Sequence, residues 1–185
     1  MSRITLIDVQ NRPKAPPIAG ATAADRMNGR RLAAYHRMHL DEMARVRRLI
    51  TTIRSGESPF GMLSDAVGAM QMARNYSVFG AVCGRECQML TFHHTGEDAQ
   101  MFPAIHERGS DGLKRVVEKL AAEHLVIHDL IEELQAGADA IAAHPDLATF
   151  DALVATFDDL EEIVRSHFGY EETELAEALG VYDLI

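Results

Sequence analysis

Histidine and glutamate side chains recur at one spacing in two distant parts of the chain. The stretch HHTGEDAQMFP contains His93 and Glu97, and the stretch HFGYEETEL contains His167 and Glu171. Residues four apart lie about one turn apart on the same face of a helix, so each imidazole and its carboxylate can reach a common centre. Imidazole and carboxylate donors without a thiolate suit iron, manganese or zinc.

Both motifs lie within apolar stripes of the helices that carry them. The stripe around His167 and Glu171 spans about 80° and is formed by Leu153, Phe157, Leu160, Val164, Leu175 and Ala178. The same sector around His93 and Glu97 contains Phe79, Cys83, Leu90 and Met101. Two carboxylates and two imidazoles buried there without compensation would be strongly destabilising. We therefore expect cations in the core.

Further histidines lie on the apolar faces of the other helices. His124 is in line with an apolar stripe, and His128 follows one turn later, while His36 and His39 lie on either side of the first helix's stripe. Counting residues from the turns places His124 opposite the motif at residues 93–97 and brings His124 closer than His128 to the level of the motif at residues 167–171. The sequence therefore predicts a dinuclear metal centre shared by four helices.

Helical periodicity covers most of the chain, and strand signals are nearly absent. The predicted helices cover residues 22–55, 61–70, 73–102, 111–143 and 146–178. Pro103 and the segment ERGSDG at residues 107–112 should end the third of these helices, and Gly180 should be a left-handed cap after the last one. Short connections between long helices predict an all-α fold, an antiparallel up-down four-helix bundle with a short extra helix between its first two long helices.

The chain divides into an extended N-terminal arm at residues 1–21, a bundle at residues 22–180 and a short tail at residues 181–185. The arm contains three of the six prolines and lacks helical periodicity. The length of 185 residues, with 47% hydrophobic residues, suits a single domain.

Cys83 and Cys87 are one helical turn apart, which is an awkward geometry for a disulfide. This spacing favours two small core residues, with a redox or metal-related role as the alternative.

The net charge of −10 would repel phosphate groups, so neither nucleic acid nor an anionic membrane is an expected partner. No apolar run approaches the roughly 18 residues that span a bilayer, and the N-terminus lacks a signal-peptide pattern. We therefore expect a cytoplasmic protein.

The number of histidine and carboxylate donors favours two iron ions with an oxo or hydroxo bridge over zinc, which usually takes four ligands, although other divalent metals remain possible.

Two other classes of metalloprotein do not fit. Ferritin-like di-iron bundles use Glu-x-x-His, and no histidine in this chain has a glutamate three residues before it. The His-Glu-x-x-His motif of zinc proteases is also absent from the sequence.

The chain resembles the hemerythrin-like HHE cation-binding family over residues of about 25–180. The resemblance lies in the blocks AAYHRMHLDEMARV, HHTGEDAQMFPAI, LAAEHLVIHDLI and SHFGYEETEL, of which the second and fourth are similar to bacterial members. It implies that the metal ligands are His36, His93, Glu97, His124, His167 and Glu171. It also implies that the two glutamates bridge the irons.

Four further residues could be ligands or could orient them. His39 is an alternative to His36, and His94 lies about 100° from its neighbour, so it is a ligand, an outer contact or a surface residue. His128 follows His124 by four residues, and this His-x-x-x-His spacing is found in oxygen-carrying hemerythrins. Glu86 could accept a hydrogen bond from a ligand imidazole or lie at the end of the bundle.

The resemblance implies a protein that binds a small ligand, namely O2, NO or peroxide, for sensing, binding or detoxification. Oxygen carriers of this family have aspartate where Glu171 stands, so the resemblance does not imply reversible oxygen carriage. An alternative is an iron-responsive regulatory module that acts through a protein partner. Another is a redox enzyme that consumes peroxide, as a catalase does, or NO, with Cys83 and Cys87 as possible participants.

Overall fold

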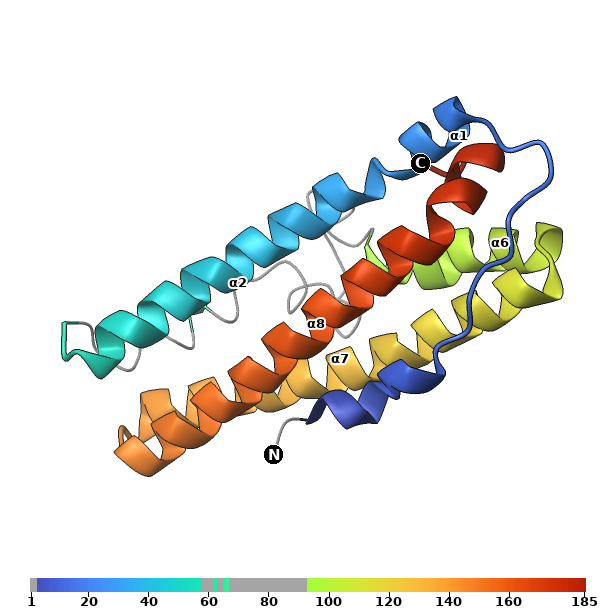
Figure 1. Cartoon of the computed structure of the whole chain (residues 1–185). Helices are drawn as coiled ribbons and strands as arrows, with labels where there is room; N and C mark the ends of the chain where they lie inside the picture. The colour runs from blue at the N-terminus through green and yellow to red at the C-terminus, as the bar shows by residue number, and fades with distance from the viewer. Residues whose placement is uncertain (1–2, 58–61, 63–64, 67–92) are drawn as a thin grey trace.

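The computed structural model describes residues 3–57, 62, 65–66 and 93–185 (Figure 1). The elements are η1 (Arg3–Ile7), η2 (Val9–Asn11), α1 (Ala23–Gly29), α2 (Leu32–Arg54), α5 (His94–Gly96), the π-helix η3 (Glu97–Met101), α6 (Phe102–Arg108), α7 (Asp111–Ala143) and α8 (Leu147–Val181). Within this described part there is no strand, and the predicted all-α class is confirmed.

Part of the predicted bundle lies outside the described residues. This part includes most of the extra helix at 61–70 and residues 73–92 of the helix at 73–102, together with Cys83, Glu86 and Cys87. The up-down order of four helices therefore stays a prediction. The division into arm, bundle and tail also stays a prediction.

Two long helices, α7 and α8, are joined by a turn at residues 144–146 and run side by side in opposite directions (Figure 1). Each begins at a side-chain cap. The side chain of Ser110 accepts a hydrogen bond from the Leu113 N–H, and that of Asp146 accepts one from the Thr149 N–H. The predicted bounds of the helix at 111–143 are confirmed, and α8 begins one residue later than predicted.

Two apolar clusters lie on either side of a buried polar layer. One cluster, on α2, α7 and α8, includes Met43, Ile50, Ile127, Leu134, Phe157 and Leu160. The other includes Leu32, Phe102, Leu113, Leu120, Leu175 and Ala178. Along α2 and α7, the buried histidines lie between residues of one cluster and residues of the other. The apolar burial on both sides fixes the level at which the helices present these polar side chains.

The single helix predicted at residues 22–55 is wrong, because the chain forms α1 and α2 with a break at Arg30 and Arg31. α1 has its own start signal, a capping box in which Thr22 and Asp25 satisfy each other's backbone N–H groups. The break lays α1 against the end of α8, as Figure 1 shows.

The predicted left-handed cap at Gly180 is also wrong, since α8 continues to Val181. The reason for this glycine is the close approach of α1 and α8. A Cβ atom at Gly180 would lie 1.8 Å from the Asp25 carbonyl oxygen. The residue that adopts a left-handed conformation is Asp183, with φ of 54°.

The predicted helix end at Pro103 is wrong as well, because helical structure continues through α6 to Arg108, where it ends within the predicted segment ERGSDG. The π-helix η3 precedes this proline, and the Phe102 N–H donates to the Glu97 carbonyl, five residues earlier. Pro103 consequently lies in the first turn of α6, where its missing N–H costs little.

The N-terminal arm is not extended throughout, since η1 and η2 are short 3-10 turns. Ile7 is buried in the apolar cluster shared by α7 and α8, so the beginning of the arm packs on these helices. None of the helices in the described part of the chain is long and apolar enough to cross a membrane.

Candidate metal centre

The structure brings six buried donors together as two groups of three. His36, His93 and Glu97 form one trio, and His94, His124 and His167 form the other. Within each trio, the potential ligand atoms all lie within 4.8 Å of one another. The donors come from α2, α7 and α8 and from the segment that begins at His93.

Glu97 connects the two trios. Its Oε1 lies 3.2 Å from His93 Nδ1 in one trio, and its Oε2 lies 3.6 Å from His124 Nε2 in the other.

Glu171 has the same intermediate position, from the opposite motif. Its Oε2 lies 3.3 Å from His36 Nε2 and 3.8 Å from His167 Nε2. Each glutamate of the two His-x-x-x-Glu motifs therefore lies between imidazoles of both trios.

Most of the donor atoms lack hydrogen bonds within the described structure, whereas Nε2 of His124 and Nε2 of His167 pair with each other at 3.1 Å. Among the trios and Glu171, the buried atoms without a hydrogen-bond partner are Nε2 of His36, His93 and His94 and both carboxylate oxygens of Glu97 and Glu171. A buried polar atom left unpaired typically costs about 1–3 kcal/mol, and more if charged. Metal ions compensate such atoms, so the donor set fits a cation.

The electrostatics of the two trios favour neutral imidazoles. Burial lowers the pKa of His93 and His94 well below 6.5, and the neighbouring imidazoles lower it further. Burial also lowers the pKa of His167, against the hydrogen bond with Glu123. Neutral imidazole is the form that coordinates a metal, so these histidines need not lose a proton near neutral pH.

The two glutamates differ in their surroundings. Burial, followed by the charge of Glu171, raises the pKa of Glu97 well above 4.5. Burial also acts to raise the pKa of Glu171, but the close contact with His36, whose Nε2 lies 3.3 Å from Glu171 Oε2, and the nearby imidazoles lower it overall. A bound cation would stabilise both carboxylates in the ionised form.

Three histidines of the trios are oriented by carboxylates behind them. His36 Nδ1 lies 2.8 Å from Glu172, and His124 Nδ1 lies 2.8 Å from Asp98. An imidazole held through Nδ1 in this way presents its Nε2 to the centre and becomes a stronger donor. Asp98 and Glu172 directly follow Glu97 and Glu171 in the sequence. This pair of adjacent acidic residues occurs in both motifs, and it is the sequence signal that could have indicated a supporting carboxylate.

The third of these carboxylates is Glu123, whose Oε2 lies 3.0 Å from His167 Nδ1. Sequence reasoning missed this residue, because it stands beside His124 but supports a histidine on another helix. Burial raises its pKa, and the hydrogen bonds from His167 and Arg12 lower it by more. Glu123 is therefore ionised near neutral pH, although it is buried.

A backbone irregularity admits two adjacent histidines to the centre. His93 has φ of −77° and ψ of −104°, outside helical geometry, and the helix begins with the next residue. The side chains of His93 and His94 consequently do not point about 100° apart, as adjacent residues of a helix do, and both are buried. His94 is only 4% exposed, so it is not a surface residue, and it belongs to the trio with His124 and His167.

The other predicted candidates lie outside both trios. His39 is buried beside His93, with ring centroids 4.6 Å apart, but His36 is the trio member from α2. His128 is partly exposed, and its Nε2 lies 3.0 Å from Glu132. This pair has the same His-x-x-x-Glu spacing, so the spacing identifies ligands only on a buried face.

These features define a helical metal-binding protein with histidine and carboxylate donors in its core. The chain matches the hemerythrin HHE cation binding domain over residues 29–179 and belongs to this family, which confirms the resemblance seen in the sequence. Comparison with curated proteins and with solved structures gave no match.

Proposed function

We propose that the protein is a non-haem di-iron protein that binds a small ligand, O2, NO or peroxide, between its helices. The observation that carries this proposal is the position of Glu97 and Glu171, each between imidazoles of both trios. Carboxylates shared by two groups of donors suit a pair of ions better than two separate sites.

The donor count supports iron and leaves room for a ligand. Five imidazoles and two shared carboxylates would fill about nine of the roughly twelve positions of two octahedral ions. The imidazoles are those of His36, His93, His94, His124 and His167. Bound iron would supply open coordination positions and a reversible one-electron change.

The surroundings of the donors favour a small ligand. Phe168 stacks on His36, with ring centroids 3.9 Å apart and an interplanar angle of 3°. Phe102 stacks on His124 with ring centroids 5.3 Å apart. These rings and the apolar clusters on both sides limit access of bulk water to the donors, which suits a diatomic molecule or peroxide.

Metal counting after anaerobic reconstitution with ferrous iron tests the proposal. We expect about two irons per wild-type chain and near-ultraviolet absorption that changes on addition of O2, NO or peroxide. Glu97→Gln and Glu171→Gln should each hold fewer than two irons. Glu132→Gln is the matched control, because Glu132 is the fourth residue after a histidine but is exposed. A wild-type protein that holds one iron or none would contradict a di-iron centre.

The ligand experiments also separate binding from turnover. A spectrum that returns when O2 is removed indicates reversible binding. Gas release from peroxide, or loss of NO from solution over many equivalents, indicates an enzyme. An iron-dependent change in oligomeric size, with no response to any of the three ligands, would favour the regulatory alternative over ligand binding.

A further inference from the structure

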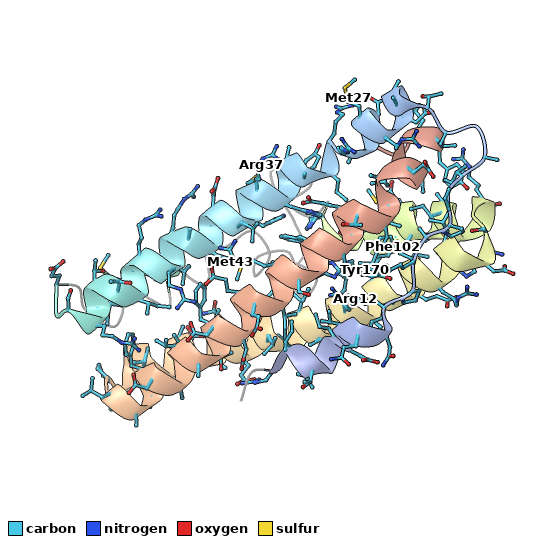
Figure 2. The ribbon with its side chains drawn as sticks, viewed as in Figure 1. Arg12, Met27, Arg37, Met43, Phe102 and Tyr170 are labelled. Carbon is cyan, nitrogen blue, oxygen red and sulfur yellow. The ribbon has the colours of Figure 1, made fainter. Side chains whose placement is uncertain are left out.

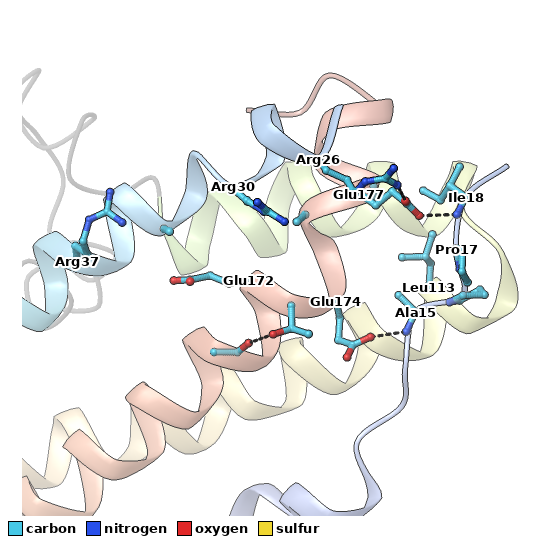
Figure 3. Close-up of a pocket in the computed structure, with 16 residues that line it drawn as sticks. Ala15, Pro17, Ile18, Arg26, Arg30, Arg37, Leu113, Glu172, Glu174 and Glu177 are labelled. Carbon is cyan, nitrogen blue, oxygen red and sulfur yellow. Dashed lines mark hydrogen bonds and ion pairs between the residues drawn. The ribbon is translucent and has the colours of Figure 1, made fainter. Parts of the chain in front are cut away.

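The N-terminal arm is attached to α8 by a series of hydrogen bonds. The backbone N–H of Ala15 donates to Glu174 Oε2 at 2.6 Å, and that of Ile18 donates to Glu177 Oε2 at 2.6 Å (Figure 3). The Tyr170 hydroxyl donates to the Pro13 carbonyl at 2.7 Å. These bonds keep the arm in one register along the helix.

Arg12 extends from this arm to the carboxylate behind the metal centre. Its Nε and Nη2 donate to the two oxygens of Glu123 at 2.9 and 2.8 Å, in the bidentate geometry that gives strong and directional pairing. Both partners are shielded from water, since the side chain of Arg12 is 9% exposed and that of Glu123 is 1% exposed.

The guanidinium is itself held in place by α8. Its Nη1 donates to the carbonyl and to the hydroxyl of Ser166 at 3.0 and 2.9 Å. It also lies over the ring of Tyr170, 4.6 Å from the ring centroid, and Figure 2 shows the two side chains next to each other. The plane and position of the Arg12 guanidinium are therefore fixed by Glu123 on α7 and by Ser166 and Tyr170 on α8.

The contacts continue from Arg12 to a metal ligand. Glu123 Oε2 accepts from Arg12 Nη2 and lies 3.0 Å from His167 Nδ1. Because Arg12 holds both oxygens of Glu123, this carboxylate cannot rotate freely. It therefore sets the orientation of the His167 imidazole. It also shares its charge with the guanidinium, which weakens its pull on the Nδ1 proton.

The other two supporting carboxylates lack this arrangement. Glu172, behind His36, is 37% exposed, and Asp98, behind His124, is 42% exposed. In the part of the chain that the structure describes, neither is paired with an arginine. Among the described carboxylates that support a trio histidine, the buried, arginine-bound one belongs to the trio that contains His167.

We propose that Arg12 is a positioning residue of the metal centre, through which the N-terminal arm orients His167 and makes the two metal positions unequal. Removal of Arg12 should loosen His167 and weaken metal binding at its trio. It should also lower the reduction potential of an iron bound there, because a positive charge is lost and Glu123 polarises His167 more strongly. The second effect rests on the proposed di-iron function, whereas the first holds for any divalent ion.

Titration of the metal-free protein with Co²⁺ tests the first effect. We expect Arg12→Gln to bind Co²⁺ about threefold to tenfold more weakly at one position, a part of the 10–100-fold that loss of an outer hydrogen-bond partner costs. The visible absorption of the bound Co²⁺ should change as well. In the double variant with Glu123→Gln, the Arg12 substitution should have little additional effect, because Arg12 acts through that carboxylate.

Arg3→Gln is the matched control for attachment of the arm. Arg3 also lies on the arm and pairs with Glu133 and Asp159, away from both trios. It should leave Co²⁺ affinity and absorption unchanged. Equal behaviour of Arg3→Gln and Arg12→Gln would overturn the proposal, because Arg12 would then only fasten the arm.

The variant Arg12→Lys separates the effect of the positive charge from that of the bidentate contact with Glu123. It also replaces Arg12→Gln as the test if that variant does not fold. It keeps the positive charge but loses the bidentate fork, so Co²⁺ affinity should be only partly restored. Wild-type affinity and absorption in Arg12→Lys would overturn the role of the fork.

Iron loading tests the second effect. Mössbauer spectra of the ⁵⁷Fe-loaded protein should change for one of two iron components in Arg12→Gln, and the potential of that iron should shift to more negative values. Arg12→Lys should restore the potential. If the wild-type protein does not hold two irons, the di-iron proposal fails, while the Co²⁺ titration still decides the role of Arg12.

Discussion

The side chain of His94 enters the candidate metal centre because its neighbour departs from helical geometry. An ideal helix would separate the two rings by about 100°, whereas the structure buries both. We expect His94→Gln to weaken metal binding at its trio by at least about tenfold, since loss of an outer partner alone costs 10–100-fold. The measurement is metal affinity by titration. His128→Gln should bind as the wild type does, because His128 pairs with Glu132 outside both trios.

His39 is a different case, a buried imidazole that belongs to neither trio. Both of its ring nitrogens lack a hydrogen bond in the described structure, although Nδ1 lies 3.8 Å from Glu42. Replacing a buried, unpaired polar group by an apolar one is often neutral or stabilising. His39→Leu should therefore keep its full metal content and melt at the wild-type temperature or above. His36→Gln should lose metal, and the opposite pattern would assign the ligand role to His39.

The helices α1 and α8 touch through two glycines. A Cβ atom at Gly29 would lie 1.8 Å from the Ala176 carbonyl oxygen, and one at Gly180 would lie 1.8 Å from that of Asp25. Gly180→Ala should therefore destabilise the protein by about 1–3 kcal/mol, as overpacking does. Chemical denaturation measures the change. Gly169→Ala, on the same helix with no atom within 4 Å of the added Cβ, should be neutral or stabilising by up to about 1 kcal/mol.

The course of these helices was only partly predictable from sequence. The helix at 111–143 was predicted correctly because serine and glycine-rich signals lie at its start and a His-Pro turn follows it. The break after Gly29 and the passage through Pro103 depend on contacts and on a π-helix that periodicity does not contain. Periodicity reports which residues face the core, whereas the packing of α1 on α8 decides where the backbone bends.

The whole molecule places its polar donors between two apolar layers, and this arrangement was predictable in outline. The inward face of each motif followed from its apolar neighbours, and His124 followed from counting residues between turns. The support from Arg12 was not predictable, because it lies on an arm without periodicity, 111 residues from Glu123. Long-range contacts of this kind depend on the folded arrangement, and a single sequence carries no spacing rule for them.

Without metal, the stability of the molecule should depend on pH through its buried imidazoles. Burial lowers the pKa of His93, His94 and His167, so below pH 6.5 the unfolded chain binds protons that the folded chain excludes. Burial raises the pKa of Glu97, which acts in the opposite direction, but one carboxyl opposes three imidazoles. The free energy of unfolding of the metal-free protein should therefore fall as the pH decreases from 7 to 5. His94→Gln should reduce this slope by up to about 1.4 kcal/mol per pH unit, the contribution of one proton. Denaturant titrations across this range measure both slopes, and stability that rises toward pH 5 would show that the imidazoles are not buried in neutral form.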